Sequence, residues 1–246
     1  MAMRVDVVTE EEFASRAADI VCAAVRERPD AVLGLPSGST PVDLYAELAG
    51  RVAAGTADFS RATGFAIDEL HGVPASHPAT NAAYFREHLT DRVPLRALHI
   101  LSSEAGEPEA ECERFQRLID EAGGLDLVVL GIGRNGHIAF NEPGSPFDSR
   151  TRRVALTEES RRPYARPFGS LEATPAFGLT LGIAGLLAAR DALLLGRGAE
   201  KAAIVAKALE GPVTEAVPAS ALQRHPKLTV LLDRVAAGRL RRRPRS

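Results

Sequence analysis

The stretch GIGRNGHIAFNEPG, residues 131–144, brings together side chains that can move protons. It follows the apolar run LDLVVL and places Asn135, His137 and Glu142 within eight residues. An imidazole titrates near neutral pH, and amide or carboxylate neighbours can orient it and tune its pKa. The stretch therefore predicts a catalytic loop with His137 at its centre.

The context of this loop argues against a dinucleotide or a metal. The spacing G-x-G-x-x-G, with Glu158 about 20 residues on, is typical of a dinucleotide-binding loop that runs straight into a helix. Here Pro143, Gly144 and Pro146 follow, so no regular helix of useful length can form. No second histidine or cysteine stands at ligand spacing, so we expect no metal. What remains is a turn that offers backbone N–H groups, those of Gly131, Ile132 and Gly133.

A second cluster has the composition of an anion-binding turn, made of Ser37, Gly38, Ser39 and Thr40. Their backbone N–H groups and the positive end of the helix that follows could hold a phosphate; a capped turn without a ligand is the alternative. Lys201 in GRGAEK and Arg166 in RRPYARPF could add positive charge, or could be solvated surface side chains. The turn lacks the lysine and the length of a Walker loop, which favours a phosphate monoester over a nucleoside triphosphate.

Two carboxylates follow the predicted strand ATGFAI directly. Adjacent residues of an extended chain face opposite ways, so only one of Asp68 and Glu69 should enter a site there. A partly desolvated carboxylate can shuttle a proton at a carbon next to a carbonyl. A turn or cap aspartate is the alternative.

The elements that must position these residues alternate along the chain. Helices are predicted at 9–28, 40–55, 79–89, 108–124, 179–189 and 199–210, and strands at 31–35, 62–67, 97–101, 125–132, 191–196 and 228–232. The first helix opens with a capping box, Thr9 and Glu12, and the second with Thr40 as cap and Pro41 as its first residue. This order predicts an α/β fold over residues 1–246 as a single domain: three layers, with a mostly parallel central sheet covered by helices on both faces. Residues 141–153 read as a loop. In such sheets a ligand lies outside the carboxyl ends of the strands. Four polar clusters fall there, at residues 36–41, 68–72, 131–142 and 198–201.

The bulk properties exclude some classes of partner. A net charge of −2 favours neither nucleic acid nor an anionic membrane, and no apolar run reaches the length of a membrane span. Two cysteines without metal or disulfide spacing, Cys22 and Cys112, agree with a cytoplasmic location. The basic tail, residues 239–246, is expected to be a solvated terminus.

With these residues assembled, the sequence resembles the glucosamine-6-phosphate deaminase/isomerase family, a sister of the 6-phosphogluconolactonases. The matching motifs occur in order along nearly the whole chain: LGLPSGSTP, AIDELHGVP, LGIGRNGHIAFNEPG, SRTR, the G-x-x-K of 198–201, and LQRHPK. The most specific is GHIAFNEPG, since the lactonases typically continue differently after Gly-His.

The resemblance implies an aldose–ketose isomerisation of a hexosamine phosphate with loss of ammonia, without a metal or organic cofactor. It implies that Asp68 moves a proton from carbon 2 to carbon 1. His137 would assist opening of the sugar ring, supported by Asn135 and Glu142. Residues 37–40, Arg166 and Lys201 would hold the phosphate.

Departures from the family pattern lie close to the implied base and to the imidazole. Leu70 and His71 replace an aromatic and an aliphatic residue, and Thr80-Asn81 replaces a common Ser-Tyr. Asn135 stands where some members carry an aspartate. Val154 replaces a basic residue that binds an allosteric anion in hexameric members, so we expect little activation by an amino-sugar phosphate.

Three rival functions remain at this point. Galactosamine-6-phosphate deamination and 6-phosphogluconolactone hydrolysis would use the same fold, and the continuation NEPG favours a deaminase over a lactonase. A catalytically inactive sugar-phosphate-binding regulator is the third. The phosphate turn comes within about 40 residues of the start, which leaves no room for a preceding DNA-binding segment. The sequence leaves assembly into a homo-oligomer open.

Overall fold

The computed structural model describes residues 3–241, so most of the basic tail lies outside the described residues. Its centre is a seven-stranded sheet in which every pair of neighbours is parallel. In sheet order the strands are β1 (Arg4–Val8), β10 (Leu228–Asp233), β9 (Asp191–Gly196), β6 (Leu127–Gly131), β2 (Val32–Leu35), β3 (Thr63–Ala66) and β5 (Ala97–His99). The predicted α/β fold with a mostly parallel sheet is therefore confirmed.

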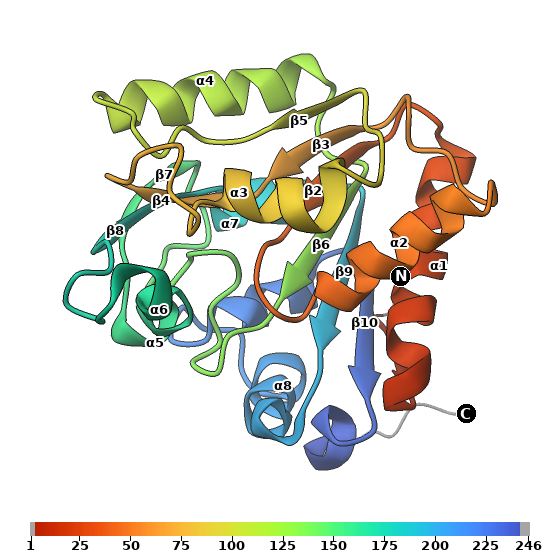
Figure 1. The fold of residues 1–246 in the computed structure, drawn as a ribbon. Coiled ribbons are helices and arrows are strands. Elements are labelled where there is room, and N and C mark those ends of the chain that lie inside the picture. The colour runs from red at the N-terminus through yellow and green to blue at the C-terminus, as the bar shows by residue number, and fades with distance from the viewer. Residues whose placement is uncertain (1–2, 242–246) are drawn as a thin grey trace.

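Helices cover both faces of this sheet (Figure 1). They are α1 (Glu10–Glu27), α2 (Val42–Ala53), α3 (Asn81–Phe85), α4 (Pro108–Glu121), α7 (Ile183–Leu187) and α8 (Ala202–Glu210). The side chains of β6 show how the layers form. Val128 and Leu130 pack in one core cluster with residues of α4 and α8, whereas Leu127 and Val129 pack in the other with residues of α1 and α2. Strand residues alternate between the two faces of a sheet, so a continuous apolar run serves both cores.

A smaller antiparallel sheet, absent from the sequence prediction, stands beside the parallel one. Its order is β4 (Asp68–His71), β8 (Phe177–Thr180) and β7 (Arg152–Ala155). Two short helices, α5 (Glu158–Arg161) and α6 (Ala165–Phe168), lie near it on the left of Figure 1. A separate apolar cluster that includes Leu70 and Phe140 packs beneath them.

Several boundaries differ from the prediction, and the strand β1 was not predicted at all. The predicted helix 179–189 is wrong in its first residues: Leu179 and Thr180 belong to β8, and α7 begins only at Ile183, after Gly182. Thr40 does not cap α2, which begins at Val42 with Pro41 as its cap residue and no side-chain cap. The Pro41 carbonyl accepts the first helical bond, from the N–H of Tyr45 at 2.9 Å, and proline has no side-chain oxygen that could act as a cap. The predicted loop 141–153 ends early, because β7 begins at Arg152.

Other local predictions agree with the structure. The capping box is present: the Thr9 side chain accepts from Glu12 N–H, and the Glu12 side chain accepts from Thr9 N–H. Gly55, predicted to end α2, takes a positive φ of 68° just after it. Within residues 3–241 no helix combines the length and the apolar character needed to cross a membrane.

Candidate active site

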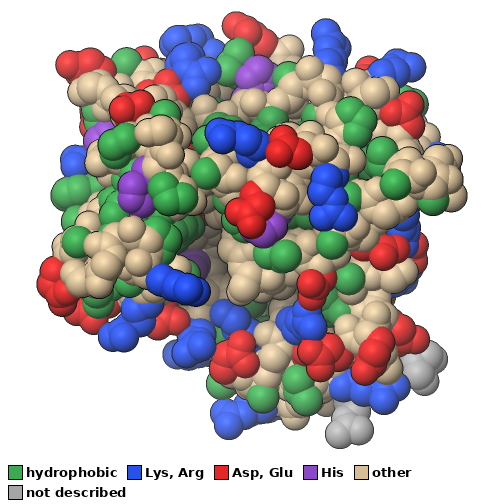
Figure 2. All heavy atoms as spheres, viewed as in Figure 1, with side chains coloured by type: hydrophobic (Ala, Val, Ile, Leu, Met, Phe, Trp, Pro, Cys, Tyr) green, Lys and Arg blue, Asp and Glu red, His purple; other side chains and the backbone are tan. Residues whose placement is uncertain are grey.

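A cavity of about 980 Å³ opens where strands β2, β6 and β9 end at their carboxyl edge. In Figure 2 the surface is hollowed in this region, and blue Lys and Arg side chains stand at the rim of the hollow. Most of the residues singled out from the sequence line it: Ser37, Gly38, Ser39, Thr40, Asp68, Gly131, Ile132, Gly133, His137 and Lys201. The topology thus gathers segments that lie up to 164 residues apart in the sequence, from Ser37 to Lys201.

Three predicted residues do not line the cavity. Asn135 and Glu142 lie behind His137. Both lie close to Nδ1 of His137, and they are hydrogen-bonded to each other. Arg166 is exposed on α6, outside the lining. Arg162, one helical turn earlier, does line the cavity and forms an ion pair with Glu158 at 3.2 Å. The part of Arg166 in binding stays a prediction.

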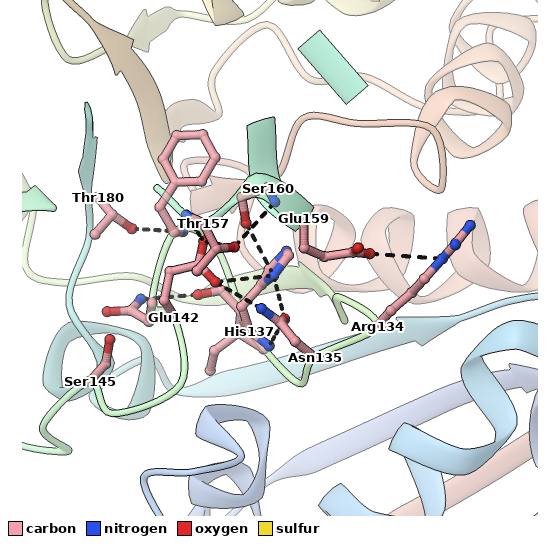
Figure 3. Close-up of polar contacts among 12 residues, drawn as sticks. Arg134, Asn135, His137, Glu142, Ser145, Thr157, Glu159, Ser160 and Thr180 are labelled. Atoms are coloured by element: carbon pink, nitrogen blue, oxygen red, sulfur yellow. Dashed lines mark hydrogen bonds and ion pairs between the residues drawn. The ribbon is translucent and has the colours of Figure 1, made fainter. Parts of the chain in front are cut away.

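The imidazole of His137 is held by a network of side chains (Figure 3). Asn135 Oδ1 lies 2.7 Å from His137 Nδ1 and also accepts the backbone N–H of His137, at 3.1 Å. The amide Nδ2 of Asn135 donates to Glu142 Oε2 at 2.9 Å, and the other oxygen of Glu142 accepts from the backbone and hydroxyl of Thr157. Ser160 Oγ lies 3.3 Å from the same ring nitrogen. The ring is thus fixed from the Nδ1 side.

The loop backbone is shaped to admit this ring. A Cβ on Gly133 would collide with Cε1, Nδ1 and Nε2 of His137, so only glycine leaves room for the imidazole. Gly136 takes a φ of 90°, a conformation that side-chain-bearing residues rarely adopt. Gly133 therefore leaves space for the imidazole, and Gly136 allows the turn of the loop and its close contact with Val217 and Ile204.

Burial lowers the pKa of His137, and the neighbouring Glu142 carboxylate opposes that shift in part. The net direction is downward, so the imidazole is neutral at neutral pH. A neutral imidazole can accept a proton and return it, as acid–base catalysis requires.

Asp68 occupies the junction of the two sheets. It is the first residue of β4 and is separated from the end of β3 only by Ile67. Its side chain is buried, with 6% of the residue exposed. Burial raises its pKa to about 7, against hydrogen bonds from Asn81 and Ser37 that lower it. Glu69 faces the other way, is fully buried and does not line the cavity. The expected division between the two carboxylates is therefore observed.

The turn of residues 37–40, between β2 and α2, is held by two tyrosines. Gly38 adopts a φ of 106°, and its carbonyl accepts the hydroxyl of Tyr84 at 2.8 Å. The hydroxyl of Tyr45 donates to the Pro36 carbonyl at 2.7 Å. Lys201 also lines the cavity, and burial lowers the pKa of its ammonium group.

Sequence reasoning missed several lining residues. They are Asn81, Tyr84, Arg134, Ser160, Arg162, Tyr164 and Arg197. Most come from segments without a motif, so only the fold brings them to the site. Thr80 caps α3 through Ala83 N–H, and this capping residue is a local signal from which the sequence could have placed Asn81 at a helix start. Among residues 3–241, no group of three His, Cys, Asp or Glu side chains is arranged to hold a metal ion.

A parallel α/β sheet that presents a serine- and glycine-rich turn, a buried carboxylate and a neutral imidazole at one edge is typical of an acid–base enzyme. Within that class, the chain belongs to the glucosamine-6-phosphate isomerases/6-phosphogluconolactonase family, whose sequence profile matches residues 7–231.

Individual relatives are similar over nearly their whole length. The chain is 45% identical over 227 residues to the glucosamine-6-phosphate deaminase of Pseudarthrobacter chlorophenolicus, covering 92% of this chain and 87% of that protein. It is 42% identical over 235 residues to glucosamine-6-phosphate deaminase 2 of Bacillus subtilis, covering 94% of each. The solved structure of a monomeric glucosamine-6-phosphate deaminase superimposes with a TM-score of 0.92 at 40% identity, over 96% of this chain and 100% of that one. A 6-phosphogluconolactonase from Thermotoga maritima, at 23% identity, gives a TM-score of 0.73 over 94% and 99% of the two chains, and shares the fold.

Proposed function

We propose that this protein deaminates glucosamine-6-phosphate to fructose-6-phosphate and ammonia. The observation that carries the proposal is the pairing of a buried carboxylate, Asp68, with a neutral imidazole, His137, in one cavity lined by an anion-binding turn. The deaminase relatives, at 42–45% identity over most of the chain, support the same reaction.

The first step is opening of the pyranose ring. His137 holds its Nδ1 proton toward Asn135, so Nε2 is the nitrogen that can accept a proton. It takes the proton of the hydroxyl on carbon 1 and returns a proton to the ring oxygen as the bond between carbon 1 and that oxygen breaks. The imidazole thus ends the step as it began.

The second step is the isomerisation. The Asp68 carboxylate removes the proton on carbon 2 and delivers it to carbon 1, while a proton of the amine passes to the carbonyl oxygen on carbon 1. The amine on carbon 2 thereby becomes an imine and carbon 1 becomes an alcohol. Water adds to the imine and ammonia leaves, giving the ketose. A carboxylate with a pKa near 7 is well matched to this task, because general acid–base catalysis is most efficient when the pKa lies near the working pH.

Binding would rest on the phosphate. The backbone of residues 37–40 at the start of α2, with Lys201 across the cavity and Arg166 from α6, would hold this group away from the reacting carbons. Contacts remote from the chemistry supply positioning energy. A cytoplasmic location and a choice between a monomer and a homo-oligomer stay predictions; both described cysteines are free and buried.

The direct test measures release of ammonia and fructose-6-phosphate from purified protein. Glucosamine-6-phosphate, galactosamine-6-phosphate and 6-phosphogluconolactone are assayed in parallel. Stoichiometric release of both products from the first substrate is expected. Hydrolysis of the lactone alone, or faster turnover of the galactosamine substrate, would replace the proposal by that rival. Inactivity on all three, with retained binding of a sugar phosphate, would point to a regulator.

A further inference from the structure

Asn81 contacts the proposed base more closely than any motif residue does. It is the first residue of α3 and is 1% exposed. Its side-chain Nδ2 donates to the backbone carbonyl of Asp68 at 2.7 Å and to the carboxylate Oδ1 of Asp68 at 2.8 Å. A primary amide nitrogen carries two hydrogens, so both are used on the same residue. Asn81 therefore holds the main chain and the side chain of Asp68 together.

Asn81 is itself fixed by the other carboxylate of β4. Glu69 Oε1 accepts the backbone N–H groups of Asn81 and Leu70, both at 2.8 Å, and Oε2 accepts that of Ala82 at 3.2 Å. Because neighbouring strand residues face opposite ways, Asp68 enters the cavity while Glu69 anchors the start of α3. Strand and helix thus form a closed set of hydrogen bonds around the base.

This arrangement distinguishes the two oxygens of Asp68. Oδ1 receives Asn81 and, at 3.5 Å, the hydroxyl of Ser37. No hydrogen bond within residues 3–241 ends on Oδ2. Among these residues, Arg161 Nε is the one fully enclosed side-chain N or O atom without a hydrogen-bond partner, so Oδ2 must be accessible. Oδ2 is therefore the oxygen that opens to the cavity.

We propose that Asn81 is a positioning residue for the isomerisation: by holding Oδ1 it makes Oδ2 of Asp68 the atom that moves the proton. The bond between carbon 2 and its hydrogen breaks as Oδ2 gains the proton, and Oδ2 then gives it up as the new bond to carbon 1 forms. The inference rests on the proposed function, because it assigns the step to Asp68.

The groups around Asp68 leave Asn81 as its strongest hydrogen-bond donor. Glu69 lies beside it on β4, and three phenols are close enough to interact with its charge: Tyr45 from α2, Tyr84 from α3 and Tyr164 from the turn at 162–164. Burial raises the pKa of each phenol, so all three stay neutral. The hydrogen bond from Asn81 lowers the pKa of Asp68, and its removal should raise that pKa further.

The test compares Asn81→Ala with Thr80→Ala. Thr80 caps the same helix without touching Asp68, so its variant controls for a weakened α3. For Asn81→Ala we expect kcat to fall by about 10–100-fold with KM within about threefold, and the acidic limb of the kcat profile to move up by about one pH unit. In D₂O, the loosened carboxylate should exchange its proton more often, so more deuterium should enter carbon 1 of the product. The control should lower Tm without moving the limb.

A second measurement separates this inference from the proposed function. The ¹³C signal of the Asp68 carboxyl, assigned by its loss in Asp68→Asn, is titrated in the absence of substrate. A higher pKa in Asn81→Ala supports the inference even if the wild-type protein proves to have another substrate. An active wild type whose Asp68 titration and pH limb are unchanged in Asn81→Ala would overturn the inference and leave the proposed function standing.

Discussion

Asn135 Oδ1 lies 2.7 Å from Nδ1 of His137, and this contact decides which ring nitrogen is available for chemistry. An amide oxygen only accepts, so Nδ1 must carry the proton and Nε2 must be the free acceptor. The amide cannot be turned the other way, because its Nδ2 donates to Glu142 and its oxygen also accepts the His137 backbone N–H. Asn135 therefore sets the tautomer of a residue two positions further along the chain.

Asn135→Asp should raise the pKa of His137. The new carboxylate would face Nδ1, and a negative charge at hydrogen-bond distance stabilises the imidazolium by about one to three pKa units. The neutral acceptor would then be lost at a higher pH than in the wild type, so kcat/KM should fall on the acidic side. A proton NMR titration of the His137 ring measures the shift directly. Asn135→Ala is the control: it removes the same hydrogen bonds without adding charge, so a rise in both variants would rule out the carboxylate as the cause.

Gly133→Ala should displace the imidazole without unfolding the protein. The added methyl group would occupy the space of the His137 ring, which must then leave its position beside Asn135. We expect kcat/KM to fall by about 100-fold or more, as for a misplaced catalytic group, with the far-UV circular dichroism spectrum preserved.

Gly50→Ala gives the matched comparison for that substitution. Gly50 lies in α2, is exposed, and has nothing within 4 Å of the position of a Cβ. Alanine there should stabilise the fold by about 0.5–1 kcal/mol and leave turnover unchanged. Equal activity in Gly133→Ala and Gly50→Ala would mean that the packing of the ring on Gly133 has no catalytic importance.

The sequence predicted the parallel sheet because its signals are local. Apolar runs such as 127–130 and 192–195 are long enough to read as buried strands, and the segments between them have helical spacing. The antiparallel sheet was not predicted because its strands DELH, RRVA and FGLT are only four residues each. DELH and RRVA mix charges with apolar residues, and the last two residues of FGLT were assigned to a helix. Short strands of this kind form through pairing with distant partners, which periodicity does not reveal.

The residues of the candidate site likewise include some that local sequence signals predicted and others that they did not. Asn135, His137 and Glu142 could be found together because one loop carries all three, and the opposite facing of Asp68 and Glu69 followed from strand geometry. Asn81 stood out only as a departure from a family pattern. Its contact with Asp68 depends on α3 packing against β4, which no local spacing encodes. Residues from motif-free segments therefore required the structure.

We expect Lys201 and Arg166 to bind the phosphate of the substrate, and Arg162 to make no important contact with it. Lys201 lines the cavity, so Lys201→Ala should raise KM by about tenfold or more, the loss of a charge-assisted hydrogen bond. Arg162 is already paired with Glu158, whereas the exposed Arg166 has no ion pair among the residues described. We expect Arg166→Ala to raise KM and Arg162→Ala to change it little. Steady-state kinetics of the three variants would decide; the reverse order for the arginines would assign the phosphate to Arg162.

Asp68→Asn should lower kcat by roughly 10²–10⁴-fold, the usual contribution of a general base, and leave binding of an open-chain substrate analogue largely intact. Near-normal turnover in this variant would remove Asp68 from the mechanism. In the wild type, kcat/KM should rise with pH as Asp68 ionises with its pKa of about 7, because only the carboxylate can accept the proton on carbon 2.

The same substitution should also change how stability depends on pH. The pKa of Asp68 is about 7 in the folded protein and about 3.9 in an unfolded chain, so the native state holds this proton more tightly. Its contribution to stability is fully present below about pH 4 and is lost as the pH rises through about 7. Asparagine cannot ionise and avoids that loss, so the Tm of Asp68→Asn relative to wild type should increase from pH 5 to pH 8, by about 2–4 °C for each kcal/mol. A Tm difference that is constant over this range would show that Asp68 is already ionised at pH 5 in the native protein, and would argue against a base that works near neutral pH.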